Sequence, residues 1–458
     1  MRSRTLRAVF AAALFAVCTL PAVAGGTHES AASGAQVRGL PLVAPNSSDV
    51  VLARGLPPVA WSGSFSVYTP WLAPAAKKGD YAFQSLFEKY YPRARLDYQF
   101  LTPQSKILTV VSSRLVAGNP PTAAAIDLGM FMINFAKSGA LVNLTSVWKK
   151  YDLRKLIPGG VAATAEYRGK YYGIPLLVAP HNFLWWNKKL FEEAGVRQPP
   201  YRTWSEFFTA ARAFEAKMHI PFISIGLVPG EFALENAVYL AAKRYGTAMA
   251  FRILNGDATA QDFSDMLTFM KKYLSFASKG ASSLDGNFGP SEQVASGQAA
   301  LCMSGQWARN SFAKQGMLLG KGYGLAHLPG PNILYFVSGG FMIFKGSGKE
   351  EIGKALASLG ASSAAQVDFS DKGAVPARTD VAMNPKVFPV TSFAAAKEMK
   401  NATLLPVPID ALPAQAENAY PPEVVSYLVE QQGLRTTVDN LLRLQQKYRA
   451  AFIVGWGA

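Results

Sequence analysis

The spacing of the apolar side chains changes repeatedly along the first third of the chain. Residues 65–68 and 96–100 carry short apolar runs that predict strands. Residues 81–90 and 107–115 place apolar side chains at helical spacing, which predicts two amphipathic helices. Residues 123–127 have the length and the apolar composition of a buried strand. This β-α-β-α-β order predicts a parallel sheet with helices packed on its faces.

A second α/β region begins near Gly173. The sequence Thr203-Trp-Ser-Glu206 fits a capping box, in which the threonine accepts a hydrogen bond from a backbone N–H and the glutamate reaches back to the cap. The apolar residues of 207–214 supply the buried face of the helix that follows. Further helices are expected at 394–400, 422–431 and 437–448. Two α/β lobes and these helices account for the 458 residues without a third domain.

Residues 1–24 have the features of a secretory signal peptide. Three arginines form a positive n-region, residues 8–20 are apolar but too short to span a bilayer, and small residues precede an expected cleavage after Ala24. The alternative is an N-terminal anchor that stays in the protein. Cleavage would remove Cys18 and leave Cys302 alone. We therefore expect an exported protein, periplasmic or extracellular, without an internal disulfide.

The charge balance is strongly basic. The chain has 46 Lys+Arg against 30 Asp+Glu, a formal net charge of +16, which raises nucleic acid or a membrane surface as a partner. The basic residues are spread thinly rather than clustered on one element, so we expect no nucleic-acid partner. Half of the residues are apolar and only 17% are charged, which excludes disorder over most of the chain.

No motif of an enzyme, a metal site or a nucleotide site is complete in the sequence. There is no G-x-S-x-G elbow and no H-E-x-x-H pair. The segment Gly346-Ser-Gly-Lys349 lacks the first glycine of a phosphate loop and the Ser/Thr that would bind magnesium. The four histidines are widely separated, and no spacing among them predicts zinc. We therefore expect no catalytic residue, no metal and no cofactor.

Four segments carry a resemblance to a known family. The longest runs over residues 173–207 and contains Gly173-Ile-Pro-Leu-Leu-Val-Ala-Pro-His-Asn-Phe-Leu-Trp-Trp-Asn187. The others are Val116-Ala-Gly-Asn-Pro-Pro121, Gly297-Gln-Ala-Ala-Leu-Cys-Met-Ser-Gly-Gln-Trp-Ala308 and Lys372-Gly-Ala-Val-Pro-Ala-Arg378. In this order they resemble the extracellular (periplasmic) solute-binding proteins of ABC importers, in the carbohydrate-binding branch and especially the glucose/mannose-type sugar binders. The resemblance covers roughly residues 65–447.

The resemblance implies an α/β, two-lobe periplasmic binding protein fold, with hinge crossovers and a ligand cleft between the lobes. Crossovers are expected near residues 175–179, 325–329 and 365–375. The expected parts are an N-lobe of residues 65–177 plus 329–372 and a C-lobe of residues 178–328 plus 373–458. Residues 25–64 are rich in Gly, Ala, Ser and Pro, which favours a flexible N-terminal extension ahead of the first lobe.

Nine residues are candidates for the ligand site. Ligands of parallel α/β sheets bind beyond the carboxyl ends of the strands, and Trp71 and Asp127 follow the first and third strands. The alternatives for these two are a core tryptophan and a helix cap. The resemblance adds His181, Asn182, Gln306, Trp307, Gly339, Gly340 and Arg378. Arg378 could instead form a surface salt bridge.

The sequence departs from the glucose-type pattern at three polar positions. Ala179-Pro180 replaces a His-Arg pair, Gln306 replaces an Asp, and Ser338-Gly339-Gly340 stands where Ser-Asp-Ser occurs. The resemblance thus implies a monomeric binder that captures a sugar or related small solute and delivers it to the permease subunits of an ABC transporter, but it leaves the solute open. A polyol, a polyamine or an anion is the alternative ligand, and an exported carbohydrate-active enzyme is the alternative activity.

Overall fold

The computed structural model describes residues 49–71, 74–102, 104–181, 183–370, 374–453 and 455–457. The expected signal peptide (residues 1–24), residues 25–48 of the expected extension and the site candidate Asn182 lie outside the described residues. Within the described ranges, no helix combines the length and the apolar character needed to cross a bilayer.

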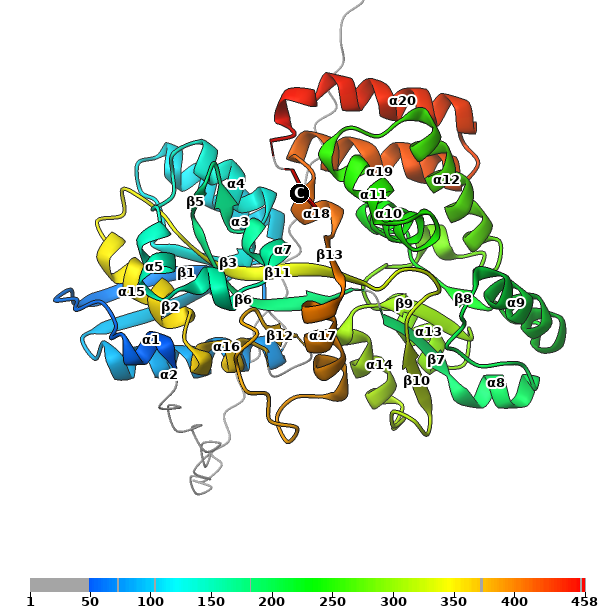
Figure 1. The fold of residues 1–458 in the computed structure, drawn as a ribbon, viewed down its shortest axis with the longest axis horizontal. Coiled ribbons are helices and arrows are strands. Elements are labelled where there is room, and N and C mark those ends of the chain that lie inside the picture. The colour runs from blue at the N-terminus through cyan, green and yellow to red at the C-terminus, as the bar shows by residue number, and fades with distance from the viewer. Residues whose placement is uncertain are drawn as a thin grey trace, which may run out of the picture. The chain divides into compact units, whose positions relative to one another are not determined.

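A mixed sheet lies at the centre of the described chain (Figure 1). Its strands are β1 (Gly63–Thr69), β2 (Ala94–Phe100), β3 (Ala123–Asp127), β6 (Gly173–Pro180), β11 (Ile333–Ile343), β12 (Val375–Pro376) and β13 (Thr403–Pro406). Neighbouring strands follow the order β12-β6-β11-β3-β1-β2, and β13 pairs with β11. β1 is parallel to β2 and β3, which confirms the predicted β-α-β-α-β unit. β11 is antiparallel to β3 and β6, so the sheet is mixed rather than purely parallel.

A smaller sheet has the strand order β10-β7-β9-β8. Its strands are β7 (Phe183–Asn187), β8 (Ile223–Ser224), β9 (Leu301–Ser304) and β10 (Tyr323–Ala326), while β4 (Glu166–Tyr167) and β5 (Lys170–Tyr171) form a separate hairpin. All five residues of β7 are buried. Since successive side chains of a strand point to opposite sides, both faces of β7 are covered. Trp185 belongs to one hydrophobic cluster and Trp186 to the other, so both tryptophans are structural.

Helices cover both sheets. They are α1 (Val50–Ala53), α2 (Pro74–Tyr90), α3 (Gln104–Val116), α4 (Met130–Lys137), α5 (Thr145–Lys150), α6 (Leu153–Leu156), α7 (Gly159–Ala163), α8 (Lys188–Ala194), α9 (Trp204–Met218), α10 (Glu231–Tyr245), α11 (Thr247–Asn255), α12 (Ala260–Leu274), α13 (Gly289–Ala295), α14 (Arg309–Lys314), α15 (Glu350–Gly360), α16 (Ser363–Ser370), α17 (Val390–Asn401), α18 (Pro408–Ala411), α19 (Ala414–Leu428) and α20 (Leu434–Lys447). The 3-10 turns are η1 (Ala281–Ser283), η2 (Gln306–Ala308) and η3 (Arg449–Ala451).

The expected cap of α9 is half correct. The Thr203 hydroxyl accepts from the backbone N–H of Glu206 at 3.1 Å, as predicted. The Glu206 carboxylate, however, accepts from the N–H of Arg202 at 2.8 Å, one residue before the expected donor. A complete capping box occurs instead between Thr259 and Asp262, at the start of α12.

Two hydrophobic clusters form the core of the described chain. The first surrounds β1–β3 and includes Phe83, Ile126 and Phe341, and the second lies between α9–α12 and α19–α20. β11 is shared, since Phe336 packs in the first cluster and Tyr335 in the second. In Figure 1 this long strand runs from the elements around β3 toward those around α10. These clusters give the two-lobe α/β organisation that the resemblance implies.

The segment just before β1 differs from the expected loose extension. Residues 50–53 form α1, and Asp49 caps its N-terminus. The backbone N–H of Val51 donates to the Asp49 carboxylate at 3.0 Å. The Tyr91 hydroxyl donates to the Pro57 carbonyl at 2.9 Å. Composition does not predict this packing, because its main polar anchor, Asp49, depends on partners more than 300 residues away along the chain.

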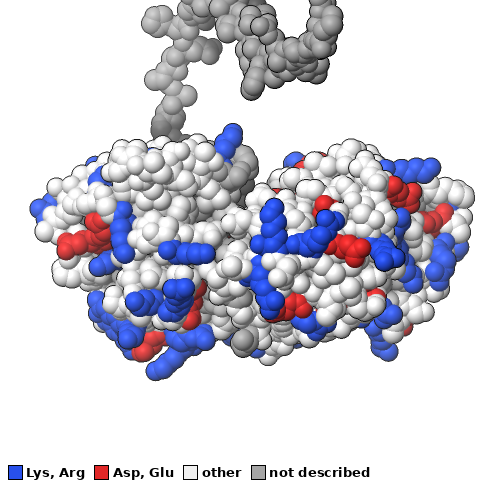
Figure 2. Space-filling model, turned by 90° about the horizontal axis from the view of Figure 1, so that it is seen from above, with Lys and Arg blue, Asp and Glu red and all other residues white. Residues whose placement is uncertain are grey.

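The distribution of surface charge agrees with the spread seen in the sequence. On the face drawn in Figure 2, Lys and Arg side chains are scattered between Asp and Glu side chains and do not gather into one continuous patch. This face therefore lacks the clustered basic surface that a nucleic-acid interface needs.

Candidate functional site

The first half of the candidate site lies where β1 and β3 end beside β11. Gly339 of β11 is the register partner of Asp127 at the end of β3. A Cβ atom on Gly339 would lie 2.8 Å from Cζ2 of Trp71, so only glycine allows the indole to approach this strand. Trp71 is half-buried, and its ring meets that of Phe369 edge-on with centroids 5.9 Å apart.

The second half lies where β6 and β9 end. His181 follows β6, and its backbone N–H donates to the Tyr335 carbonyl of β11 at 2.8 Å. The His181 and Trp307 rings meet edge-to-face, with centroids 4.6 Å apart. Trp307 is held in η2, and its indole N–H donates to the Asn287 carbonyl at 2.7 Å. Next to it, Oε1 of Gln306 is buried and has no hydrogen-bond partner among the described residues.

Asp127 joins the two halves electrostatically. Burial penalises its charged form and raises the pKa of its carboxyl from 3.8 to about 6, against the opposing effects of the His181 charge and of Gln104. Oε1 of Gln104 accepts from the backbone N–H of Asp127 at 3.2 Å. Gln104 begins α3, just after the carboxyl end of β2. The strand-end rule that selects Trp71 could therefore have selected Gln104 as well.

Two carboxylates at the site carry no signal in the sequence. Oε1 of Glu235, on α10, lies 2.5 Å from Nδ1 of His181, and both side chains are about 85% buried, with 13% and 15% exposed. Oδ2 of Asp410, on α18, accepts from the backbone N–H of Ser338 at 3.2 Å. Asp410 stands among apolar residues and Glu235 lies on an ordinary helix, and only the fold brings the two together.

Asp410 is completely buried beside the turn that follows β3. Its backbone carbonyl would lie 2.1 Å from a Cβ atom on Gly129, so only glycine lets α18 pack this close to the turn. The φ of 67° at Gly129 also favours glycine. Burial raises the pKa of Asp410 well above 3.8, and the negative charges of Asp127 and Glu235 raise it further. Oδ1 of Asp410 has no hydrogen-bond partner among the described residues.

Gly340 lies inside the sheet. A Cβ atom there would come within 2.5 Å of the Ile174 carbonyl oxygen, and the β6–β11 register shifts between Gly339 and Gly340. Its observed role is thus the close packing of β6 on β11.

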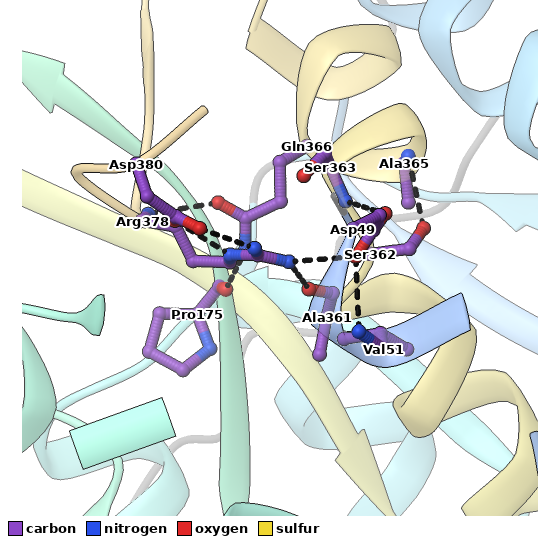
Figure 3. Close-up of polar contacts among 10 residues, drawn as sticks. All are labelled: Asp49, Val51, Pro175, Ala361, Ser362, Ser363, Ala365, Gln366, Arg378 and Asp380. Carbon is purple, nitrogen blue, oxygen red and sulfur yellow. Dashed lines mark hydrogen bonds and ion pairs between the residues drawn. The ribbon is translucent and has the colours of Figure 1, made fainter. Parts of the chain in front are cut away.

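Arg378 is not placed to contact a ligand, which corrects its assignment to the site. Its side chain is 0% exposed, and its guanidinium binds Asp49 at 3.3 Å, Asp380 at 2.7 Å and the Ala361 carbonyl at 2.7 Å (Figure 3). Its backbone N–H donates to Gln366, which in turn donates to the Pro175 carbonyl of β6. The sequence does not show that Asp49 lies beside the guanidinium of Arg378, so Arg378 cannot be told from a ligand-binding arginine by sequence alone.

The two halves of the site together offer a defined chemistry. Each half carries one indole as an apolar face, and a carboxylate, an imidazole and an amide among the site residues can accept or donate hydrogen bonds. A small polar solute with an apolar C–H face fits such a set. The described residues hold no group of three or more His, Cys, Asp or Glu side chains arranged for a metal ion.

Comparison with known proteins identifies the family of the chain. Residues 63–367 match the family model described as bacterial extracellular solute-binding protein, which is more than half of the chain. A probable sugar-binding periplasmic protein of Rhizobium meliloti is 31% identical over 281 residues, covering 60% of this chain and 67% of that protein. A protein of the same description from Brucella suis is 31% identical and aligned over 66% of its length. The chain thus spans about two thirds of the curated relatives it matches.

Solved structures share the fold at low identity. A chitin oligosaccharide binding protein superposes with a TM-score of 0.71 at 20% identity, over 85% of this chain and 99% of that one. A maltose-maltodextrin binding protein of Alicyclobacillus acidocaldarius gives a TM-score of 0.63 at 14% identity, over 84% of this chain and 100% of that one. With the family match, these likenesses establish the two-lobe fold, and the chain belongs to the bacterial extracellular solute-binding protein family.

Proposed function

We propose that this chain is the substrate-binding component of an ABC importer, and that it captures a sugar or a related small solute between Trp71 and Trp307. The observation that carries the proposal is a series of neighbours at the strand ends. Trp307 packs on His181, and the charge of His181 acts on Asp127. Asp127 is in turn the register partner of Gly339, which Trp71 approaches. A sugar presents an apolar C–H face that stacks on an indole, and hydroxyls that hydrogen-bond carboxylate and imidazole groups. The curated relatives described as sugar-binding support the same class of ligand.

The remaining parts of the proposal follow from this role. The protein is exported after cleavage near Ala24, acts as a monomer, performs no chemistry and passes its solute to membrane permease subunits. The solute selects a closed arrangement of the lobes, 65–177 plus 329–372 and 178–328 plus 373–458, by motion at the strands that join them. Asn182 stays a candidate contact because it follows His181.

A thermal-shift panel on the mature protein tests the proposal. Sugars, polyols, polyamines and anions are added singly, because a ligand that binds the native state raises its stability. We expect at least one sugar to raise Tm. Replacing Trp307 with alanine should abolish that shift, whereas Tyr245→Ala, which removes an aromatic ring that is 42% exposed, should leave it unchanged. A shift with charged solutes alone, or product formed from an oligosaccharide, would contradict the proposal.

A further inference from the structure

Three hydrogen bonds connect His181 to Glu235 in a closed ring that also passes through Tyr335. The backbone N–H of His181 donates to the Tyr335 carbonyl at 2.8 Å, and the Tyr335 hydroxyl donates to the backbone carbonyl of Glu235 at 2.9 Å. Nδ1 of His181 and Oε1 of Glu235, 2.5 Å apart, complete the ring. The three residues come from the end of β6, from β11 and from α10, so the ring fixes the imidazole relative to three separate elements.

Close packing holds the Glu235 side of this ring in place. Tyr335 is completely buried, and its ring stacks on that of Tyr239 with centroids 5.0 Å apart and an interplanar angle of 23°. Tyr239 lies one turn after Glu235 on α10, so the stack fixes the helix against β11 at the level of the Glu235 side chain. Because that side chain is itself mostly buried, its carboxylate has little freedom to turn away from His181.

The contact with Glu235 engages one of the two ring nitrogens of His181, Nδ1. An imidazole is a stronger base than a carboxylate, and an ionised carboxylate can only accept, so the proton of this hydrogen bond belongs to Nδ1. No described residue forms a hydrogen bond with Nε2, and the side chain keeps some exposed surface. The ring also packs on Trp307, at an interplanar angle of 80°. Nε2 is therefore the polar atom of the imidazole that remains for a solute lying against Trp307.

We propose that Glu235 is a positioning residue, which holds the proton of a neutral His181 on Nδ1 and so makes Nε2 the acceptor for one hydroxyl of the solute. This inference rests on the proposed function, which supplies a sugar ring against Trp307. With the proton on Nδ1, Nε2 presents a lone pair and requires a donor from the solute. With the proton on Nε2, the same atom would require an acceptor. Glu235 thus sets the polarity of this contact without touching the solute.

The polarity of Nε2 determines which solutes fit. A hydroxyl can donate to the lone pair, whereas a fluorine atom or a carboxylate at the same position can only accept and would face it unpaired. A site built to hydrogen-bond a hydroxyl rejects an analogue that lacks it, because the polar group of the protein is then left without a partner. We therefore expect a free hydroxyl to be required at one position of the sugar ring.

Nuclear magnetic resonance of the isotope-labelled mature protein tests the tautomer without any ligand. Long-range proton–nitrogen spectra at about pH 9, where an imidazole is ordinarily neutral, distinguish Nδ1–H from Nε2–H rings. The signal lost in His181→Gln assigns the residue. We expect the Nδ1–H tautomer for His181 in the parent protein and a mixture with Nε2–H in Glu235→Gln, whose amide can donate as well as accept. An Nε2–H ring in the parent protein would overturn the inference, and this result does not depend on the folding of a variant.

The matched control is Glu398→Gln, in another close His–Glu contact of the described chain. There Nε2 of His327 lies 2.5 Å from Oε1 of Glu398, on α17. The control should change the His327 signal and leave that of His181 as in the parent protein. Tm without ligand verifies that both glutamine variants fold. If Glu398→Gln produces the same mixture at His181 as Glu235→Gln does, the tautomer does not depend on Glu235 and the positioning role fails.

Titration calorimetry at the same pH connects the tautomer with binding. The sugar that raises Tm most is compared with its monofluoro-deoxy analogues, because fluorine accepts but does not donate. In the parent protein, we expect the analogue fluorinated at one position to bind at least about ten-fold more weakly than the sugar. In Glu235→Gln this penalty should fall below about three-fold, whereas hydroxyls that donate to Asp127 should keep theirs. If no penalty changes, the inference is wrong while the proposed function stands. If no sugar binds at all, the proposed function fails and the acceptor role of Nε2 fails with it, while the spectra still decide the tautomer.

Discussion

The buried contact between Asp49 and Arg378 gives the most quantitative prediction. The two side chains are 2% and 0% exposed and lie 3.3 Å apart, and the Asp49 carboxylate also accepts from the Ser363 N–H at 2.7 Å. Replacing Asp49 with asparagine keeps the shape but removes the charge opposite the guanidinium. Breaking a buried ion pair costs about 3–5 kcal/mol. Because Arg378 retains Asp380, we expect the lower end, a loss of about 3 kcal/mol in the free energy of unfolding.

Guanidinium unfolding followed by tryptophan fluorescence at pH 7 measures this loss. The matched control is Asp152→Asn, which removes the charge of an exposed pair with Arg54, whose side chains are 42% and 39% exposed. Such surface pairs contribute up to about 1 kcal/mol, so the control should unfold close to the parent protein. Equal unfolding midpoints for Asp49→Asn and the parent would refute the anchoring role of the N-terminal segment. Solute affinity should be unchanged in a folded Arg378→Met variant, and its loss there would return Arg378 to the site.

Two further predictions concern burial and close packing. Asp80 is fully buried and has no hydrogen-bond partner among the described residues, and this burial raises its pKa from 3.8 to about 8, so the folded state holds a proton at pH 7 that the unfolded state releases. The free energy of unfolding should therefore rise as pH falls from about 8 to 4. In denaturant unfolding, Asp80→Asn should gain up to about 4 kcal/mol of this free energy at pH 7 and nothing at pH 4. A parent protein that is most stable at pH 8 would contradict this. Gly339→Ala places a Cβ atom 2.8 Å from the Trp71 ring and should weaken solute binding about ten-fold in calorimetry, while costing about 1–3 kcal/mol of stability. Gly280→Ala, with nothing within 4 Å of the added atom, is its control, and equal affinity in the two variants would contradict the contact.

Much of the fold could be predicted because its signals are local. The alternation of residues 96–100 and the helical spacing of 81–90 reflect burial on one face, and both elements form as expected. The antiparallel course of β11 could not be predicted, because strand direction depends on pairing with β3 and β6, which are distant along the chain. The packing of Asp49 was missed for the same reason.

The candidate site, too, could be predicted only where its signals are local in the sequence. The strand-end rule finds Trp71 and Asp127 from local order, and the structure places both beside Gly339. Glu235 and Asp410 could not be found in this way, because a lone carboxylate on a helix is ordinary until tertiary packing buries it. The composition does not indicate them either, because a net charge of +16 describes the whole chain and not the local distribution of acidic residues.

The central claim is that a sugar sits between Trp71 and Trp307. The most direct test is a crystal structure of the mature protein with the sugar that raises Tm most. We expect the sugar ring within van der Waals contact of both indoles, with hydroxyls hydrogen-bonded to Asp127 and His181. Density for the sugar at any other place, with the two tryptophans uncovered, would contradict the account.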